Sequence, residues 1–182
     1  MILKEYIWIF KDELGNFFCD DVVKLGKQIT KKRASVGTNP IPNTKIRNSY
    51  VCFLSDYWIK EWFNNYFHVA NKSAGWNFQF HQYESFQFTE YKKNQYYKWH
   101  HDSFINDTLI RKLSGIITLS DPKDYVGGEL EIKTPENKIV KIGKQPRGTM
   151  VVFPSFLQHR VKPVTSGTRH TLVMWARGEN FK

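Results

Sequence analysis

The triplet His100-His101-Asp102 contains the side chains of this sequence that are best suited to bind a metal ion. Successive side chains of an extended strand alternate between its faces, so His100 and Asp102 would point the same way and His101 would point away. A neutral imidazole beside a carboxylate supplies two of the three ligands of a facial iron site, and a second histidine must complete it. Alone the triplet is weak evidence, because a chain with 6 histidines can contain it by chance.

His159 is the candidate for the third ligand. It follows the apolar segment Met150 to Phe153 and a turn, and it begins another predicted strand. At the mouth of a barrel, such a strand end could reach the His100/Asp102 pair from a distant part of the chain. For His159 alone, a surface or core role fits equally well.

Arg169 lies ten residues after His159 in the predicted strand of residues 169–176. Alternation puts four side chains of that strand on one face: Arg169, Thr171, Val173 and Trp175. An inward arginine among apolar residues is costly unless it meets an anion, and a guanidinium can bind a carboxylate through two hydrogen bonds. A salt bridge within the chain would explain Arg169 by itself. In combination with the histidines, it indicates a carboxylate-binding site beside a metal.

The elements that must position these residues are mostly strands. A helix is expected at Phe17 to Lys27, and a second one follows Ser55, its expected cap, because apolar residues recur with helical spacing from Ile59 to Ala70. Beyond Gly75 the apolar period changes to two. Strands are expected near the N-terminus and at residues 50–54, 76–91, 114–119, 129–132, 138–142, 149–153, 159–164 and 169–176.

Short strands separated by glycine and proline turns fit a mainly β jelly roll or barrel with flanking helices, whose mouth can hold a ligand. At 182 residues we expect one domain, residues 1–182, with a helical and mixed part over 1–75 and a jelly-roll core over about 76–178. The segment from Ala34 to Asn48 has two prolines and no period. It could be a substrate lid or a surface loop without a role.

Charge and cysteine content bear on partners and location. The net charge of +10 favours an acidic partner, either nucleic acid or protein, although scattered lysines on a solvated surface would give the same value. No run of 18 apolar residues occurs, so no membrane span is expected. Two cysteines without a CxxC spacing indicate a reducing, intracellular setting, and we expect a cytoplasmic protein.

The motifs together resemble the Fe(II)- and 2-oxoglutarate-dependent dioxygenases, and within them the prolyl 4-hydroxylase-like PKHD-type hydroxylases. The signature Tyr-x2-Gly-x2-Tyr/Phe-x2-His-x-Asp of that branch is matched by Tyr91, Tyr97, His100 and Asp102. The segments Arg111–Ile132 and Phe153–Gly178 are similar to its Leu-Ser-Asp-Pro…Gly-Gly-Glu-Leu segment and to its strand–turn–His…Gly-x-Arg ending. Asn94 stands in the place of the glycine. Asparagine tolerates a left-handed backbone better than most residues, so the turn can form.

The resemblance implies a double-stranded β-helix, which is a cupin-like jelly roll. It implies that His100, Asp102 and His159 bind Fe(II), and that 2-oxoglutarate and O2 take the other metal positions. 2-Oxoglutarate would be decarboxylated to succinate while a second substrate is hydroxylated. Ascorbate (vitamin C) is a candidate reductant.

The resemblance also assigns roles around the metal. Arg169 would hold the far carboxylate of 2-oxoglutarate, with Thr171 or Thr118 as hydroxyl partners and Tyr91 at the metal end. The side chains expected to meet the substrate are Trp175, Tyr97, Trp99 and Arg160. A core role suits Trp175 about as well.

Three functions stay open at this point. A hydroxylase of a prolyl residue in a protein or peptide agrees with the resemblance and with an aromatic mouth. An oxidative demethylase of nucleic acid would use the same iron chemistry and the positive charge, but the sequence contains no separate base-flipping lid. The third is a β-barrel binding module that retains a metal without turnover.

Overall fold

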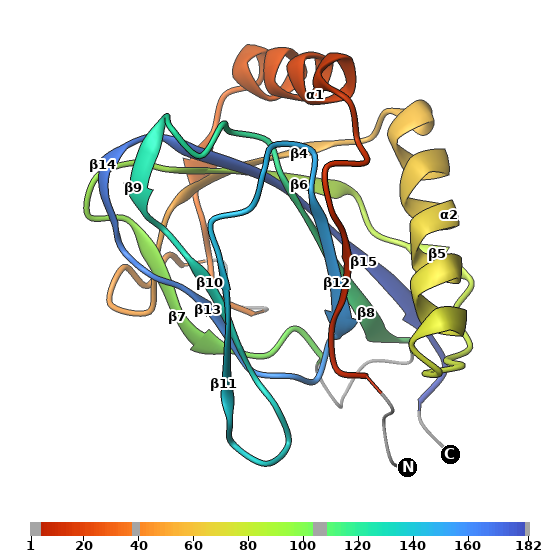
Figure 1. Ribbon diagram of the computed structural model, residues 1–182. Coiled ribbons are helices and arrows are strands. Elements are labelled where there is room, and N and C mark those ends of the chain that lie inside the picture. The colour runs from red at the N-terminus through yellow and green to blue at the C-terminus, as the bar shows by residue number, and fades with distance from the viewer. Residues whose placement is uncertain (1–4, 38–40, 104–108, 181–182) are drawn as a thin grey trace.

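The computed structural model describes residues 5–37, 41–103 and 109–180. Two β-sheets face each other, and two helices, α1 (Asn16–Gln28) and α2 (Tyr57–Ser73), lie on the outer side of the larger sheet (Figure 1). In spatial order the larger sheet contains β1 (Trp8–Phe10), β12 (Met150–Pro154), β8 (Ile110–Thr118), β15 (Arg169–Gly178), β6 (Phe86–Tyr91), β4 (Tyr50–Leu54) and β2 (Lys32–Arg33), with β5 (Gln82–Tyr83) beside β15.

The smaller sheet contains β11 (Ile139–Gly143), β10 (Leu130–Lys133), β13 (His159–Val161), β7 (Tyr96–His100) and β3 (Arg47–Asn48). A separate antiparallel pair joins β14 (Val164–Gly167) to β9 (Tyr125–Gly127). All strand pairs in the described residues are antiparallel. This arrangement confirms the predicted mainly β fold with flanking helices.

The central strands of the larger sheet are largely buried on both faces, and β15 shows why. Its side chains Leu172, Met174 and Ala176 belong to the apolar cluster that includes Phe63 and Phe67 of α2. The alternate side chains, Arg169, Thr171, Val173 and Trp175, line a cavity between the sheets. The predicted alternation of this strand is therefore correct. One face of β15 packs against α2, and the other face lines the cavity.

Three sequence expectations are corrected. The N-cap position of the second helix is occupied by Asp56, one residue after Ser55, without a capping hydrogen bond from its side chain. Residues 76–80 form no strand, although Trp76 and Phe78 are buried, because the side chain of Asn71 bonds both the amide and the carbonyl of Phe78 (2.9 and 3.0 Å). The strand expected over residues 159–164 divides into β13 and β14 on either side of Lys162 and Pro163, where β14 changes its partner to β9.

The turn between β6 and β7 forms as expected. Asn94 adopts a left-handed backbone with φ of 65°, and its amide donates to the carbonyl of Val164 (2.8 Å). Tyr91, at the end of β6, is buried. Asparagine therefore serves where the related signature has glycine. In the segment 34–48, residues 38–40 lie outside the described part, and the lid stays a prediction.

Within the described residues, no helix has the length and apolar character needed to cross a membrane.

Candidate active site

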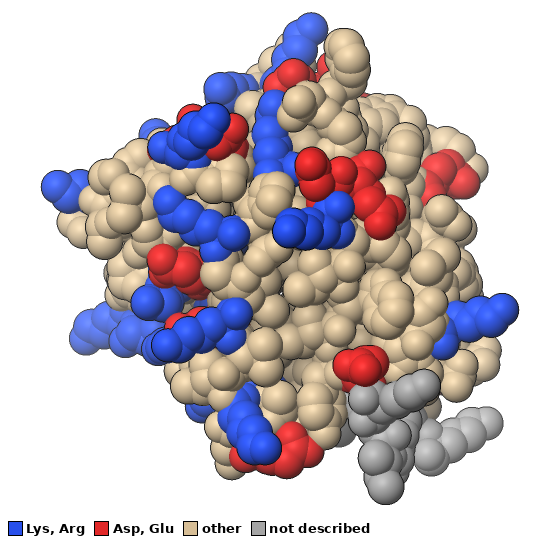
Figure 2. Space-filling view, in the orientation of Figure 1, with Lys and Arg blue, Asp and Glu red and all other residues tan. Residues whose placement is uncertain are grey.

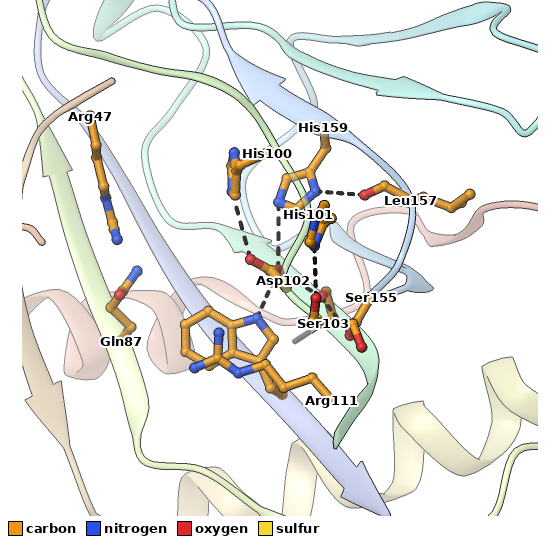
Figure 3. Close-up of polar contacts among 12 residues, drawn as sticks. Arg47, Gln87, His100, His101, Asp102, Ser103, Arg111, Ser155, Leu157 and His159 are labelled. Carbon is orange, nitrogen blue, oxygen red and sulfur yellow. Dashed lines mark hydrogen bonds and ion pairs between the residues drawn. The ribbon is translucent and has the colours of Figure 1, made fainter. Parts of the chain in front are cut away.

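Three side chains converge between the sheets: His100 at the end of β7, Asp102 just after it, and His159 at the start of β13 (Figure 3). Their potential ligand atoms all lie within 4.8 Å of one another. His100 Nε2 is 3.6 Å from Asp102 Oδ1, and His159 Nε2 is 3.5 Å from Asp102 Oδ2. The structure thus brings together the three residues that the sequence singles out, while His101 is exposed.

Backbone carbonyls fix the proton on each imidazole. Nδ1 of His100 lies 2.8 Å from the carbonyl of Lys98, and Nδ1 of His159 lies 3.1 Å from the carbonyl of Leu157. A carbonyl can only accept, so each Nδ1 carries the proton and each Nε2 keeps its lone pair. Two lone pairs and a carboxylate then face one point. A cation at that point would stabilise this arrangement of electron-rich groups. This donor set suits Fe(II).

The protonation states of His100 and Asp102 also suit metal binding. Burial, helped by the neighbouring His159, lowers the pKa of His100 to about 3. The ring is therefore neutral at neutral pH, which is the form that binds a metal. Burial alone would raise the pKa of Asp102, but the nearby histidines, the guanidinium of Arg111 and the indole of Trp175 outweigh it, and the pKa is lowered overall. The carboxylate is therefore ionised.

Two side chains from the larger sheet hold the carboxylate of Asp102. The indole Nε1 of Trp175 donates to Oδ2 (2.8 Å), and the hydroxyl of Ser114 donates to the same oxygen (2.7 Å). The backbone amide of Asp102 donates to the carbonyl of Ser155 (2.9 Å). Such partners orient a ligand and tune its affinity for the metal. Trp175 therefore lies in the cavity, as predicted, and also contacts Asp102.

A β-bulge brings Tyr97 to the site. His159 pairs with His100, but Val161 pairs with Tyr97, so β7 contains one more residue than β13 over this interval. A bulge of this kind redirects side chains. Tyr97 therefore faces the cavity with His100 and stacks on it, with 3.4 Å between ring centroids. Burial raises the pKa of Tyr97 to about 12.

The cavity has a volume of about 320 Å³ and contains the triad, Tyr91, Arg169 and Thr171 among its lining residues. Arg169 is 4% exposed, its Nε has no hydrogen-bond partner among the described residues, and its guanidinium lies 5.6 Å from the ring centroid of Tyr91. A buried cation with an unpaired donor calls for an anionic ligand. The carboxylate of 2-oxoglutarate fits that requirement.

Thr118, Arg160 and Trp99 do not line this cavity. Thr118 is buried opposite Thr171 in the sheet. Arg160 pairs with Glu131 (2.7 Å), lies over the ring of Trp99 and lines a second pocket with Trp99 and Tyr97, so its contact with substrate stays a prediction. The cavity is also lined by polar residues that belong to none of the predicted site residues: Arg47, Glu84, Gln87, Arg111 and Arg177.

Residues 86–177 match the sequence profile of the 2OG-Fe(II) oxygenase superfamily. The chain belongs to this superfamily. Membership implies Fe(II), 2-oxoglutarate and O2 as metal and cosubstrates, and the donor set and the unpaired Arg169 are compatible with the first two.

Curated relatives of this oxygenase are PKHD-type hydroxylases. One from Prochlorococcus marinus is 39% identical over 89 residues, which are 48% of this chain and 39% of the relative. Another from Hyphomonas neptunium is 50% identical over 64 residues, or 35% of this chain and 27% of the relative. The aligned part is thus well under half of each relative.

Solved structures support the same fold. A prolyl hydroxylase from Trichoplax adhaerens, in complex with a peptide fragment of the hypoxia inducible factor oxygen degradation domain, superposes with a TM-score of 0.78. It is 20% identical, and the superposition covers 93% of this chain and 82% of that one. The viral collagen prolyl hydroxylase from Paramecium Bursaria Chlorella virus-1 superposes with a TM-score of 0.71 and is 20% identical. That superposition covers 96% of this chain and 97% of the viral one. At this identity the likeness concerns the fold alone.

Proposed function

We propose that this oxygenase hydroxylates a prolyl residue in a protein or peptide and decarboxylates 2-oxoglutarate to succinate. The observation that carries the proposal is the convergence of two imidazole lone pairs, the Asp102 carboxylate and the unpaired Arg169 in one cavity. His100, Asp102 and His159 would hold Fe(II), and Arg169 the far carboxylate of 2-oxoglutarate. Thr171 and Tyr91 line the cavity beside Arg169 and stay candidates for further contacts with the cosubstrate.

The bound iron and 2-oxoglutarate supply the oxidising chemistry, in which one oxygen atom of O2 enters succinate and the other enters the substrate. The chain supplies geometry. Lys98 and Leu157 carbonyls keep both Nε2 atoms free of protons, and Ser114 and Trp175 hold the carboxylate. Burial of Asp102 and His159 limits the entry of water.

A prolyl substrate suits the aromatic side chains beside the triad. Tyr97 and Trp175 both line the cavity, and flat aromatic surfaces pack well against a proline ring. The prolyl hydroxylases among the structural neighbours, one of them bound to a peptide, favour the same substrate class. An intracellular setting is part of the proposal and agrees with two cysteines that are free and buried.

The test is incubation of the purified protein with Fe(II), 2-oxoglutarate, O2 and proline-containing peptides, followed by mass spectrometry of the peptide and measurement of succinate. We expect a mass gain of one oxygen at proline with an equivalent of succinate. Ascorbate should prolong turnover if it acts as the reductant. Alanine at His100, Asp102 or His159 should abolish both products, and full activity in any of these variants would contradict the metal assignment.

Oxidative demethylation of nucleic acid is the second candidate. Figure 2 shows lysine and arginine gathered over the smaller sheet and β9–β14, and few over α2. Exposed Lys98, Lys141 and Lys162 belong to that side. Loss of a methyl group from modified nucleic acid, with no oxygen gain on any peptide, would replace the prolyl assignment with this one.

A further inference from the structure

We propose that Arg47 and Arg111 form a carboxylate-recognition site in the cavity, which selects substrates with an acidic group close to the residue that is oxidised. The inference rests on the proposed function, because it takes the substrate to be a peptide. It concerns side chains that neither the metal nor 2-oxoglutarate requires.

Arg47 is a buried cation with neutral partners. It is 8% exposed, its Nε donates to the hydroxyl of Ser49 (3.2 Å), and its Nη1 donates to the carbonyl of Ser35 (3.3 Å). Its guanidinium lies 4.6 Å from the ring centroid of Tyr97. Among the described residues no carboxylate forms an ion pair with it. A desolvated charge without a counter-ion is unfavourable, and a bound anion would remove that penalty.

The side chain of Arg47 is aimed into the cavity. It projects from β3 at the edge of the smaller sheet, and Gln87 projects toward it from β6 in the larger sheet (Figure 3). Both line the cavity that contains the triad. Gln87 is held by a hydrogen bond to Thr89 (3.0 Å). An anion that enters beside the triad can therefore reach a guanidinium and an amide whose positions are already fixed.

Arg111 is a second, rigidly held cation. Glu84 accepts from its Nε and Nη2 (2.7 and 2.5 Å), and its guanidinium lies 3.7 Å from the ring centroid of Trp175. The same carboxylate lies 3.6 Å from Nε of Arg177. One carboxylate thus contacts two guanidiniums of the cavity.

A charge balance separates this site from the cosubstrate site. The charges of Fe(II), Asp102, 2-oxoglutarate and Arg169 cancel one another. Among the described side chains of the cavity, Arg111 pairs with Glu84, whereas Arg47 has no carboxylate partner and keeps a positive charge beside the triad. A carboxylate at the end of a side chain can enter a cavity of about 320 Å³, whereas a phosphodiester is flanked by sugars on both sides. These observations favour an acidic peptide over nucleic acid.

The test uses two fluorescein-labelled peptides, Gly-Asp-Pro-Asp-Gly and Gly-Asn-Pro-Asn-Gly, both with C-terminal amides. Binding to the protein loaded with Fe(II) and 2-oxoglutarate is measured without oxygen by fluorescence anisotropy. We expect the aspartyl peptide to bind roughly tenfold to a hundredfold more tightly than the asparaginyl peptide. A hydrogen bond to a charged group usually changes the dissociation constant by this factor. A third peptide, the asparaginyl one with a free C-terminus, shows whether a terminal carboxylate serves as well.

Arg47→Met should abolish the preference, and Arg47→Lys should keep part of it. Lys93→Met removes the same charge from an exposed turn and should leave the preference unchanged. Because Arg47→Met removes an uncompensated buried charge, its melting temperature should not fall below that of the wild type. If Arg47→Met melts at a lower temperature and loses affinity for both peptides equally, Arg47 has a structural role and the inference is overturned.

Equal affinity for the two amidated peptides, or no binding of either, also overturns it. Displacement of the aspartyl peptide by oligothymidylate in the wild type but not in Arg47→Met would assign the site to phosphate instead. Admission of O2 then tests the proposed function separately. If the preference depends on Arg47 but neither peptide gains oxygen, the carboxylate site stands and prolyl hydroxylation is contradicted.

Discussion

At the scale of single residues, Asp102 is the side chain on which the site depends most. One of its oxygens accepts hydrogen bonds from Ser114 and Trp175, and both oxygens face imidazole nitrogens that lack a proton. The carboxylate is therefore oriented before a metal binds, which lowers the entropic cost of binding.

Trp175→Phe removes the indole N–H and keeps an aromatic ring in place. We expect roughly tenfold or greater weakening of metal affinity, as for other partners of metal ligands, measured by Mn(II) titration calorimetry. Trp62→Phe, at a partly exposed position on α2, is the control. Unchanged affinity in Trp175→Phe would show that Ser114 alone orients the carboxylate.

Arg169→Met tests the anion site next to the metal. The concentration of 2-oxoglutarate needed for half-maximal succinate formation should rise by roughly tenfold or more, because a charge-assisted bidentate contact is lost. Mn(II) affinity should change little. A variant with the wild-type dependence of succinate formation on 2-oxoglutarate would rule out this role for Arg169.

At the scale of elements, periodicity predicted the strands and helices better than it predicted the site. Alternation assigned the cavity face of β15 correctly, because that strand is regular from Arg169 to Ala176. Two bulges defeat alternation elsewhere. One turns Tyr97 inward with His100, and the other, near Lys112, turns Arg111 inward with Ser114. Bulges depend on pairing with distant strands, so a local pattern does not reveal them.

Arg47 was missed for another reason. It lies in a stretch with two prolines and no period, and only its pairing in β3 with β7 brings it to the cavity. By contrast, the convergence of His100, Asp102 and His159 could be predicted, because their residue types are rare and their spacing matches a known signature. The single-domain organisation stays a prediction.

Gly115 lets α2 approach the larger sheet closely. A Cβ at this position would lie 2.9 Å from Phe67 Cζ and 2.8 Å from Met150 Cε. We expect Gly115→Ala to lower the free energy of unfolding by about 1–3 kcal/mol through overpacking, measured by urea denaturation. Phe67→Leu in the same chain should recover part of the loss. Additive effects of the two changes would contradict a direct clash.

At the scale of the whole molecule, stability should fall in acid. Burial lowers the pKa of His170, although the carboxylate of Glu90, 3.2 Å away, opposes the shift. The unfolded chain therefore takes up this proton at a higher pH than the folded chain, and folding free energy is lost as the pH falls below about 6.5.

His170→Gln should reduce that loss. Between about pH 7.5 and about pH 5.5, where Glu90 stays ionised, urea denaturation should show a smaller fall in stability than in the wild type. His68→Gln, at an exposed position on α2, should behave like the wild type. An identical fall in His170→Gln and the wild type would show that other groups cause the acid sensitivity.

The hydrogen bond between the indole of Trp175 and Asp102 also gives the protein an intrinsic optical probe. Because the excited state of an indole responds to charge at its nitrogen, metal binding at Asp102 should change the emission of this one residue among 6 tryptophans. Subtracting the spectrum of Trp175→Phe isolates its signal. Occupancy of the metal site could then be followed in real time without a label.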